Sequence, residues 1–130
     1  MGIAQLNPAG LPVPTGNYTH GTLVTEAQRT VFVSGQVNWS DENGEIPSDF
    51  ETQYRTVWRN VLAVLAEADM GVRNLAKVNM YLADRRFRDV SSTLREEILG
   101  DHCPALTIII CDIYDEAWLL EIEAVAVDVG

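Results

Sequence analysis

The C-terminal segment carries two glutamates inside a run of residues that otherwise suits a buried strand. Glu121 and Glu123 alternate with Leu120, Ile122 and Ala124, and alternate side chains of a strand point to opposite faces. The apolar residues therefore share one face, which we interpret as core, and the two acids share the other. A carboxylate buried without partners is costly or loses its charge. The pattern indicates either acids that line a cleft or interface, or an edge strand whose acids point to solvent.

Glu121 is the first candidate for chemistry. A carboxyl group with a raised pKa in a partly dry cleft can orient or deprotonate a water molecule. The alternative is a structural acid bonded to backbone N–H groups. Glu123 points the same way two residues further on, so an acid/base pair is a further interpretation of the same pattern.

Two other segments carry candidate binding residues. Ser34-Gly35-Gln36 interrupts an apolar strand, and a glycine in a strand often marks a bulge or a close backbone approach. Near a site, this segment would present backbone N–H groups to a ligand's oxygens; the alternative is a bulge that curves the sheet. Tyr18 stands at the entrance of the first predicted strand, where its ring could stack on or hydrogen-bond a small ligand.

The histidines and cysteines indicate neither a catalytic pair nor a metal site. His20 lies near a strand start and is expected to be a surface or hydrogen-bonded residue. His102 and Cys103 are adjacent, so their side chains diverge, and no third orienting group is identifiable. The spacing of these residues and Cys111 fits no zinc site, and no phosphate-cradling glycine loop is present. We expect no metal and no cofactor.

Composition narrows the class of protein further. The chain has 130 residues, 47% of them hydrophobic, which predicts one domain over residues 1–130 with a real core. The formal net charge of −10 would be repelled by phosphate backbones, so we expect no nucleic-acid partner. No apolar stretch approaches the roughly 20 residues that span a bilayer, and residues 1–10 show no secretory signal. We expect a cytoplasmic protein with reduced, buried cysteines and no membrane partner.

Hydrophobic periodicity and turn signals predict the elements that position these residues. Asn43-Gly44 indicates a tight turn, and Ser48 to Glu51 has the spacing of a helix capping box. The predicted elements are strands over 21–27 and 30–38 joined as a hairpin, a helix over 50–68, a strand over 75–83, a helix over 87–98, a central strand over 106–111 and the acidic strand over 119–127. The order β-β-α-β-α-β-β favours an α+β fold, a mixed sheet with two helices on one face.

The face of the sheet that the two helices leave uncovered also carries apolar residues. The candidates, depending on register, are Val31, Val33, Ile109, Leu119, Val125 and Val127. A large exposed apolar patch predicts self-association, and closed rotational symmetry is its usual outcome. We therefore expect an oligomer in which sheet faces are buried between subunits.

Several segments together resemble the RidA/YjgF family, whose archetype is a reactive enamine/imine deaminase. They are residues 31–37, 44–46, 49–53, 60–65, 104–105 and 121–127, and the resemblance runs from residue 7 to residue 127. It implies a homotrimer of chorismate-mutase-like architecture, in which three sheets pack into a barrel-like core. It also implies three clefts between neighbouring subunits, each a site for a small molecule.

The resemblance also implies roles for individual residues. Glu121 matches the family acid that positions the attacking water, and Tyr18 matches the tyrosine at the cleft entrance. Ser34 and Gly35 match the strand segment beside the site. Ser91 stands where many relatives have asparagine, at a position expected to line the cleft.

One position departs from the family pattern. In the deaminating members an arginine follows the Pro-Ala element and clamps the substrate's carboxylate; here that position is Leu106. Leucine cannot provide the bidentate clamp of a guanidinium, which favours a ligand without a carboxylate. Thr107 follows and could offer its hydroxyl or its N–H to a ligand oxygen.

Three functions remain open from these residues. The first is hydrolysis or deamination of a small reactive enamine or imine other than the 2-aminoacrylate type, with water held by Glu121 and developing negative charge met by N–H groups near Thr107. The second is a binding module that holds a metabolite in the same cleft without turning it over. The third is pericyclic chemistry, as in one class of chorismate mutases, which needs cationic residues in the cleft.

Overall fold

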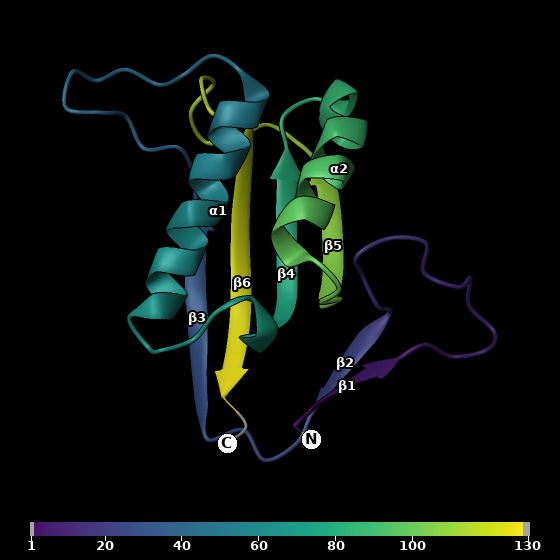
Figure 1. The fold of residues 1–130 in the computed structure, drawn as a ribbon. Helices are drawn as coiled ribbons and strands as arrows, with labels where there is room; N and C mark the ends of the chain where they lie inside the picture. The colour runs from purple at the N-terminus through teal and green to yellow at the C-terminus, as the bar shows by residue number, and fades with distance from the viewer. Residues whose placement is uncertain (1, 129–130) are drawn as a thin grey trace.

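The computed structural model describes residues 2–128, which form two sheets, two α-helices and two short 3₁₀-helices (Figure 1). In chain order the elements are β1 (Ile3–Leu6), β2 (Gly21–Val24), β3 (Arg29–Gln36), α1 (Phe50–Ala66), η1 (Val72–Asn74), β4 (Leu75–Leu82), η2 (Arg85–Phe87), α2 (Arg88–Leu99), β5 (Ala105–Ile110) and β6 (Leu120–Asp128).

The larger sheet has the strand order β3-β6-β4-β5. β6 is antiparallel to both β3 and β4, whereas β4 and β5 are parallel and are connected through α2, because parallel neighbours need a crossover. Both helices lie on the same face of this sheet (Figure 1). The predicted α+β class, with a mixed sheet and two helices, is confirmed.

The N-terminal strands differ from the prediction. β1 is a strand that the sequence pattern did not reveal, and β2 pairs with β1 rather than with β3. The predicted hairpin of residues 21–27 and 30–38 is therefore wrong. β3 pairs along β6 instead, where Val33 is buried against the core and Val31 packs beside it.

The apolar strand β5 was expected to be central, and it lies at the edge of the sheet. Its full-length pairing is with β4 alone, and a single bridge joins Ala105 to Thr19 on its other side. Ile108 and Ile109 are accordingly 36% and 47% exposed. The continuous apolar run that predicts burial on both faces is thus left partly uncovered by its own chain.

The core lies between the sheet and α1. Tyr54, Val57, Trp58, Val61 and Leu65 recur at helical spacing and are at most 1% exposed. They pack against the face of β6 made by Leu120, Ile122, Ala124 and Ala126, as the alternation predicts. Each fully buried large side chain contributes roughly 1.5–3 kcal/mol.

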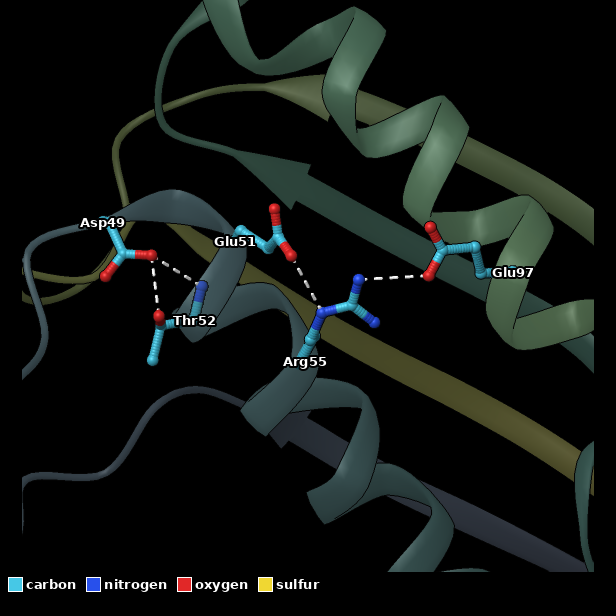
Figure 2. A network of polar contacts seen from close by, with 5 residues as sticks. All are labelled: Asp49, Glu51, Thr52, Arg55 and Glu97. Atoms are coloured by element: carbon cyan, nitrogen blue, oxygen red, sulfur yellow. Dashed lines mark hydrogen bonds and ion pairs between the residues drawn. The ribbon is translucent and has the colours of Figure 1, made fainter.

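The start of α1 is fixed by polar contacts rather than by the expected capping box. Asp49 is the N-cap, and its carboxylate accepts hydrogen bonds from the backbone N–H and the hydroxyl of Thr52 (Figure 2). These bonds lower the pKa of Asp49. Arg55 then pairs with Glu51 on its own helix and with Glu97 on α2 (Figure 2), so the two helices are also linked at their exposed edges.

The open face, opposite the helices, is more polar than expected. Val31, Val33 and Leu119 face or adjoin the core, and Val127 is buried. The register places Val31 and Val33 opposite Ala126 and Ala124, so the neighbouring Phe32 points outward and is 78% exposed. The apolar part of the open face is therefore Phe32, Ile109 and Val125, set among polar side chains.

Two smaller expectations concern membrane-spanning helices and the two cysteines. Within residues 2–128, no helix has the length and apolarity needed to cross a membrane. Cys103 and Cys111 are free thiols, as expected, but both are half-buried rather than buried.

Candidate functional site

Glu121 lies at the start of β6 on the open face, packed against the backbone of β3. A β-carbon added at Gly35 would overlap the carboxylate oxygen Oε2 of Glu121 and come within 2.8 Å of its carboxyl carbon. Gly35 has no positive φ, so the close approach of Glu121, rather than backbone strain, explains the need for glycine. Residue 35 therefore creates the space that the acid occupies.

The strand segment that contains Gly35 is bulged. The register between β3 and β6 shifts between Val33 and Gln36, which confirms the bulge indicated by the glycine and leaves Ser34 exposed beside it. Bulges re-aim side chains and release backbone groups from the ladder. Ser34 and Gly35 thus lie beside Glu121.

The pKa of Glu121 is raised, first because burial disfavours its charged form and second because of the negative charge of Glu123. Its carboxylate has no hydrogen bond or ion pair with any residue in the range 2–128. It opens on a hollow of about 180 Å³ lined by Tyr81, Cys111 and residues 112–114. A half-buried, unpartnered carboxylate beside a hollow is suited to accept a proton from water.

Glu123 differs from Glu121 because its partners are supplied by β4. Its Oε1 accepts hydrogen bonds from Asn79 Nδ2 and from the Tyr81 hydroxyl, both at 2.9 Å. The bond to Glu123 is the main cause that raises the pKa of Tyr81. The carboxyl group of Glu123 is therefore held in place by β4 next to Glu121, and the pair is not symmetric.

Lys77 and Thr107 extend this polar surface toward β5. Lys77 Nζ donates to Thr107 Oγ1 at 2.8 Å. A second hollow, of about 380 Å³, is lined by Lys77, Asn79 and Glu123 together with Phe32 to Ser34 and residues 124–125. We call the surface formed by Lys77, Asn79, Tyr81, Glu121 and Glu123 the acid face.

A buried amide positions the start of β6. Gln53 on α1 is fully buried; its Nε2 donates to the carbonyls of Pro47 and Ala117, and its Oε1 accepts from Leu119 N–H. These three bonds fix the chain two residues before Glu121. The direction of the catalytic candidate therefore depends on a residue of the helix on the opposite face.

Three of the predicted site residues lie away from the acid face. Leu106 is paired with Val78 and packs against the core on the helix side of the sheet. Ser91 is buried on α2, and Tyr18 lies in the segment that joins the edge of β5 through Thr19. The predicted residues thus form two groups: Ser34, Gly35, Glu121 and Thr107 on the open face, and Tyr18, Ser91 and Leu106 at the β5 edge and under the helices.

The histidines have the structural contacts expected of them. His20 Nε2 donates to Pro12 O and its ring meets that of Tyr18 edge to face. His102 Nε2 donates to Leu75 O, while the thiol of Cys103 approaches Asp101 O. The adjacent histidine and cysteine therefore contact different groups.

The sequence interpretation missed the polar residues of β4. Lys77, Asn79 and Tyr81 alternate with buried residues along the strand, which is the signal that could have placed them on the face of the two acids. Gln53 gave no such signal, because its partners are backbone groups 6 to 66 residues away in the sequence.

Similarity to a known protein family identifies the group to which the chain belongs. Residues 10–128 match the family described as Endoribonuclease L-PSP. The chain belongs to this family. It is the RidA/YjgF family that the sequence resembles, and that resemblance is confirmed.

Two curated relatives of this family member are similar over most of their length. A RutC family protein of Pyrococcus abyssi is 30% identical over 116 residues, which cover 88% of this chain and 89% of the relative. The 2-iminobutanoate/2-iminopropanoate deaminase of Escherichia coli is 28% identical over 120 residues, which cover 89% of this chain and 91% of the relative.

Solved structures share the fold of this family member. The Rid family protein YyfB of Yersinia pestis superposes with a TM-score of 0.82 at 23% identity, over 98% of this chain and all of that one (100%). Escherichia coli TdcF, crystallised with bound serine, superposes with a TM-score of 0.70 at 25% identity, over 96% of this chain and 98% of that one.

Proposed function

We propose that this protein hydrolyses a small reactive metabolite of the enamine or imine class, in clefts between the subunits of a homotrimer. The observation that carries the proposal is the Glu121 carboxylate, which is half-buried against Gly35, unpartnered within residues 2–128 and raised in pKa. In this mechanism Glu121 takes a proton from water as the water attacks the imine carbon and the C=N electron pair moves to nitrogen. Glu121 returns the proton to that nitrogen, and the C–N bond then breaks, which releases ammonia and leaves a carbonyl. The backbone near Thr107 stabilises the charge that develops.

The similar proteins support the reaction class. One relative is named a 2-iminobutanoate/2-iminopropanoate deaminase, and the TdcF crystals contain serine, a small amino acid. Because Leu106 stands at the position of the family arginine, we propose that the substrate is not of the archetypal 2-aminoacrylate type.

The division of the predicted residues into two groups supports a site between copies. Glu121, Ser34 and Gly35 lie on the open face, whereas Tyr18, Ser91 and Leu106 lie at the β5 edge and under the helices. A neighbouring copy could bring one group against the other and also cover Phe32 and Ile109. Sedimentation at micromolar concentration tests the trimer, and a stable monomer would contradict it. The cytoplasmic location stays a prediction.

The test of the reaction is ammonia release from enzymatically generated enamines. Glu121→Gln should lower turnover about 10²–10⁴-fold, the usual contribution of a general base, while the oligomer persists in sedimentation. Glu116→Gln, an exposed acid of the turn before β6, serves as the control of equal charge change. Turnover that survives in Glu121→Gln removes this acid from the mechanism.

The alternative function is a binding module that uses the same cleft without turnover. The specific observation that favours it is Leu106, and Leu106→Arg discriminates between the two. Ammonia release from archetypal enamines by the variant alone would support an altered substrate or a binding role in the native chain. Release at equal rates by both proteins would show that residue 106 does not set specificity.

A further inference from the structure

Arg95 on α2 is the one charged residue within residues 2–128 that is buried. It is 6% exposed, and its Nε is completely shielded from solvent without a hydrogen-bond partner. No hydrogen bond or ion pair joins its guanidinium to another residue of that range. A buried charge without a partner is strongly unfavourable, and Nε is the guanidinium atom that is shielded from solvent while residues 2–128 supply it no partner.

The groups around Arg95 are mostly hydrogen-bond donors. Trp58 Nε1, Tyr54 Oη and Ser91 Oγ are also buried without a hydrogen-bond partner. Burial raises the pKa of Tyr54, whereas polar contacts with the side chains of Trp58 and Ser91 and the charge of Arg95 lower it. The four polar groups therefore lie close together, although none of these contacts has hydrogen-bond geometry. We call these four residues the arginine pocket. An indole and a guanidinium can only donate, so the pocket suits an anion.

The pocket lies beneath the segment that carries Tyr18. A β-carbon at Gly16 would lie 3.7 Å from Arg95 Nη2, so glycine leaves that edge of the guanidinium uncovered by a side chain. The buried Asn17 donates from its side chain to Gly100 O, the C-cap of α2. Arg95 is therefore located between Ser91, one helical turn earlier, and the segment of Tyr18.

We propose that the arginine pocket binds the carboxylate of a small-molecule substrate and that Arg95 is the residue that determines this specificity. The inference rests on the proposed function, since it names the substrate class for the same cleft. A planar guanidinium holds a carboxylate through two parallel hydrogen bonds, and Trp58 and Ser91 can donate to its oxygens. Arg95 on α2 then supplies the cation that is absent from position 106 of β5. Leu106 therefore excludes only substrates whose carboxylate would have to lie against β5.

The probes are propanoate and its neutral analogue propanamide, and their binding to the full chain is followed by the NMR signal of the Trp58 Nε1–H, which every variant retains. Propanoate should shift this signal and propanamide should not. Arg95→Met should weaken propanoate binding at least about tenfold, as expected for loss of a hydrogen-bonded charge, and Arg95→Lys should weaken it less. Arg88→Met, at an exposed arginine of the same helix, should bind as the native protein does.

Several outcomes would overturn the proposal. Equal response to propanamide, no response to propanoate, or unchanged binding in Arg95→Met each do so. Dissociation of the oligomer in Arg95→Met, with no propanoate response in the native protein, would assign the pocket to a carboxylate of a second copy instead. Should Arg95→Met fail to fold, Arg95→Lys keeps the positive charge and carries the comparison.

The proposed function and the arginine pocket fail in different ways. If propanoate binding survives in Glu121→Gln and is lost in Arg95→Met, the arginine pocket is supported, regardless of how fast either variant releases ammonia. Turnover that depends on Glu121 while Arg95→Met binds propanoate normally removes the pocket and leaves the hydrolytic proposal in place. Removal of an unpartnered buried charge should also leave the melting temperature of Arg95→Met equal to or above that of the native protein.

Discussion

The acid face and the arginine pocket lie on opposite faces of the same sheet, and each contains a charged side chain with an atom that residues 2–128 leave without a partner. On the acid face, Glu123 accepts hydrogen bonds from Asn79 and Tyr81, whereas Glu121 packs against the backbone of Gly35 without a hydrogen bond within residues 2–128. In the arginine pocket, Arg95 Nε and the polar atoms of its three neighbours are buried without a hydrogen-bond partner within residues 2–128.

The two regions differ in how far their charged side chains are exposed to solvent. Glu121 is half-buried and can relax by taking up a proton, as its raised pKa indicates. Arg95 is nearly fully buried, and its guanidinium can only donate hydrogen bonds. An acid that can change its protonation state suits chemistry, whereas a buried set of donors suits recognition. In the proposed trimer, the acid face carries out the reaction and the arginine pocket binds the substrate's carboxylate.

The largest expected effect is a difference in the free energy of unfolding between variants at two neighbouring residues of α1. Gln53 makes three hydrogen bonds that fix the approach to the acid face. The Tyr54 hydroxyl contacts polar neighbours in the arginine pocket without hydrogen-bond geometry. Gln53→Met should lower the free energy of unfolding by about 2–3 kcal/mol, because buried backbone groups lose their partners. Tyr54→Phe should change it by less than about 1 kcal/mol. Urea unfolding measures both.

Equal losses in the two variants would contradict this contrast. They would mean that the Tyr54 hydroxyl has a partner in solution, and the arginine pocket would then be satisfied rather than vacant.

A smaller effect is expected from a methyl group placed against Glu121. Gly35→Ala would push the carboxylate from its position, because the added carbon overlaps Oε2. Turnover should fall about tenfold or more, as expected from displacement of a catalytic group, while propanoate binding at Arg95 stays unchanged. Gly10→Ala is the matched control, since a β-carbon there meets no atom within 4 Å. Steady-state ammonia release and NMR titration separate the two regions, and a parallel loss in both would refute their independence.

The smallest effect is a dependence of stability on pH. Because the folded-state pKa of Glu121 is raised, the protonated acid favours the folded state below its unfolded pKa. That contribution is lost as pH rises through the folded value. Glu121→Gln should therefore gain stability relative to the native protein as pH rises above the unfolded value of about 4.3. In a Glu123→Gln background the gain should shrink, because one of the two causes is removed. A pH-independent difference in chemical unfolding would contradict the raised pKa.

Much of the fold could be predicted because its signals are local. The alternation around Glu121 correctly assigned Leu120, Ile122 and Ala124 to the core, and helical spacing located α1 to within two residues of its end. The pairing of β2 with β1 could not be predicted, since several short strands present equivalent edges. The edge position of β5 was also missed, because an apolar run predicts burial without saying whether the same chain provides it.

The sequence by itself determined which residues are acids on one face of an apolar strand, where a glycine interrupts its neighbour, and which family the pattern resembles. These follow from residue type and from the fixed periods of strand and helix. Only the tertiary structure decided that Gly35 makes room for Glu121, that β4 supplies partners for Glu123 alone, and that Arg95 is buried without a partner. Register and burial arise from contacts between distant segments, and they decide which of several similar charges is left unpaired.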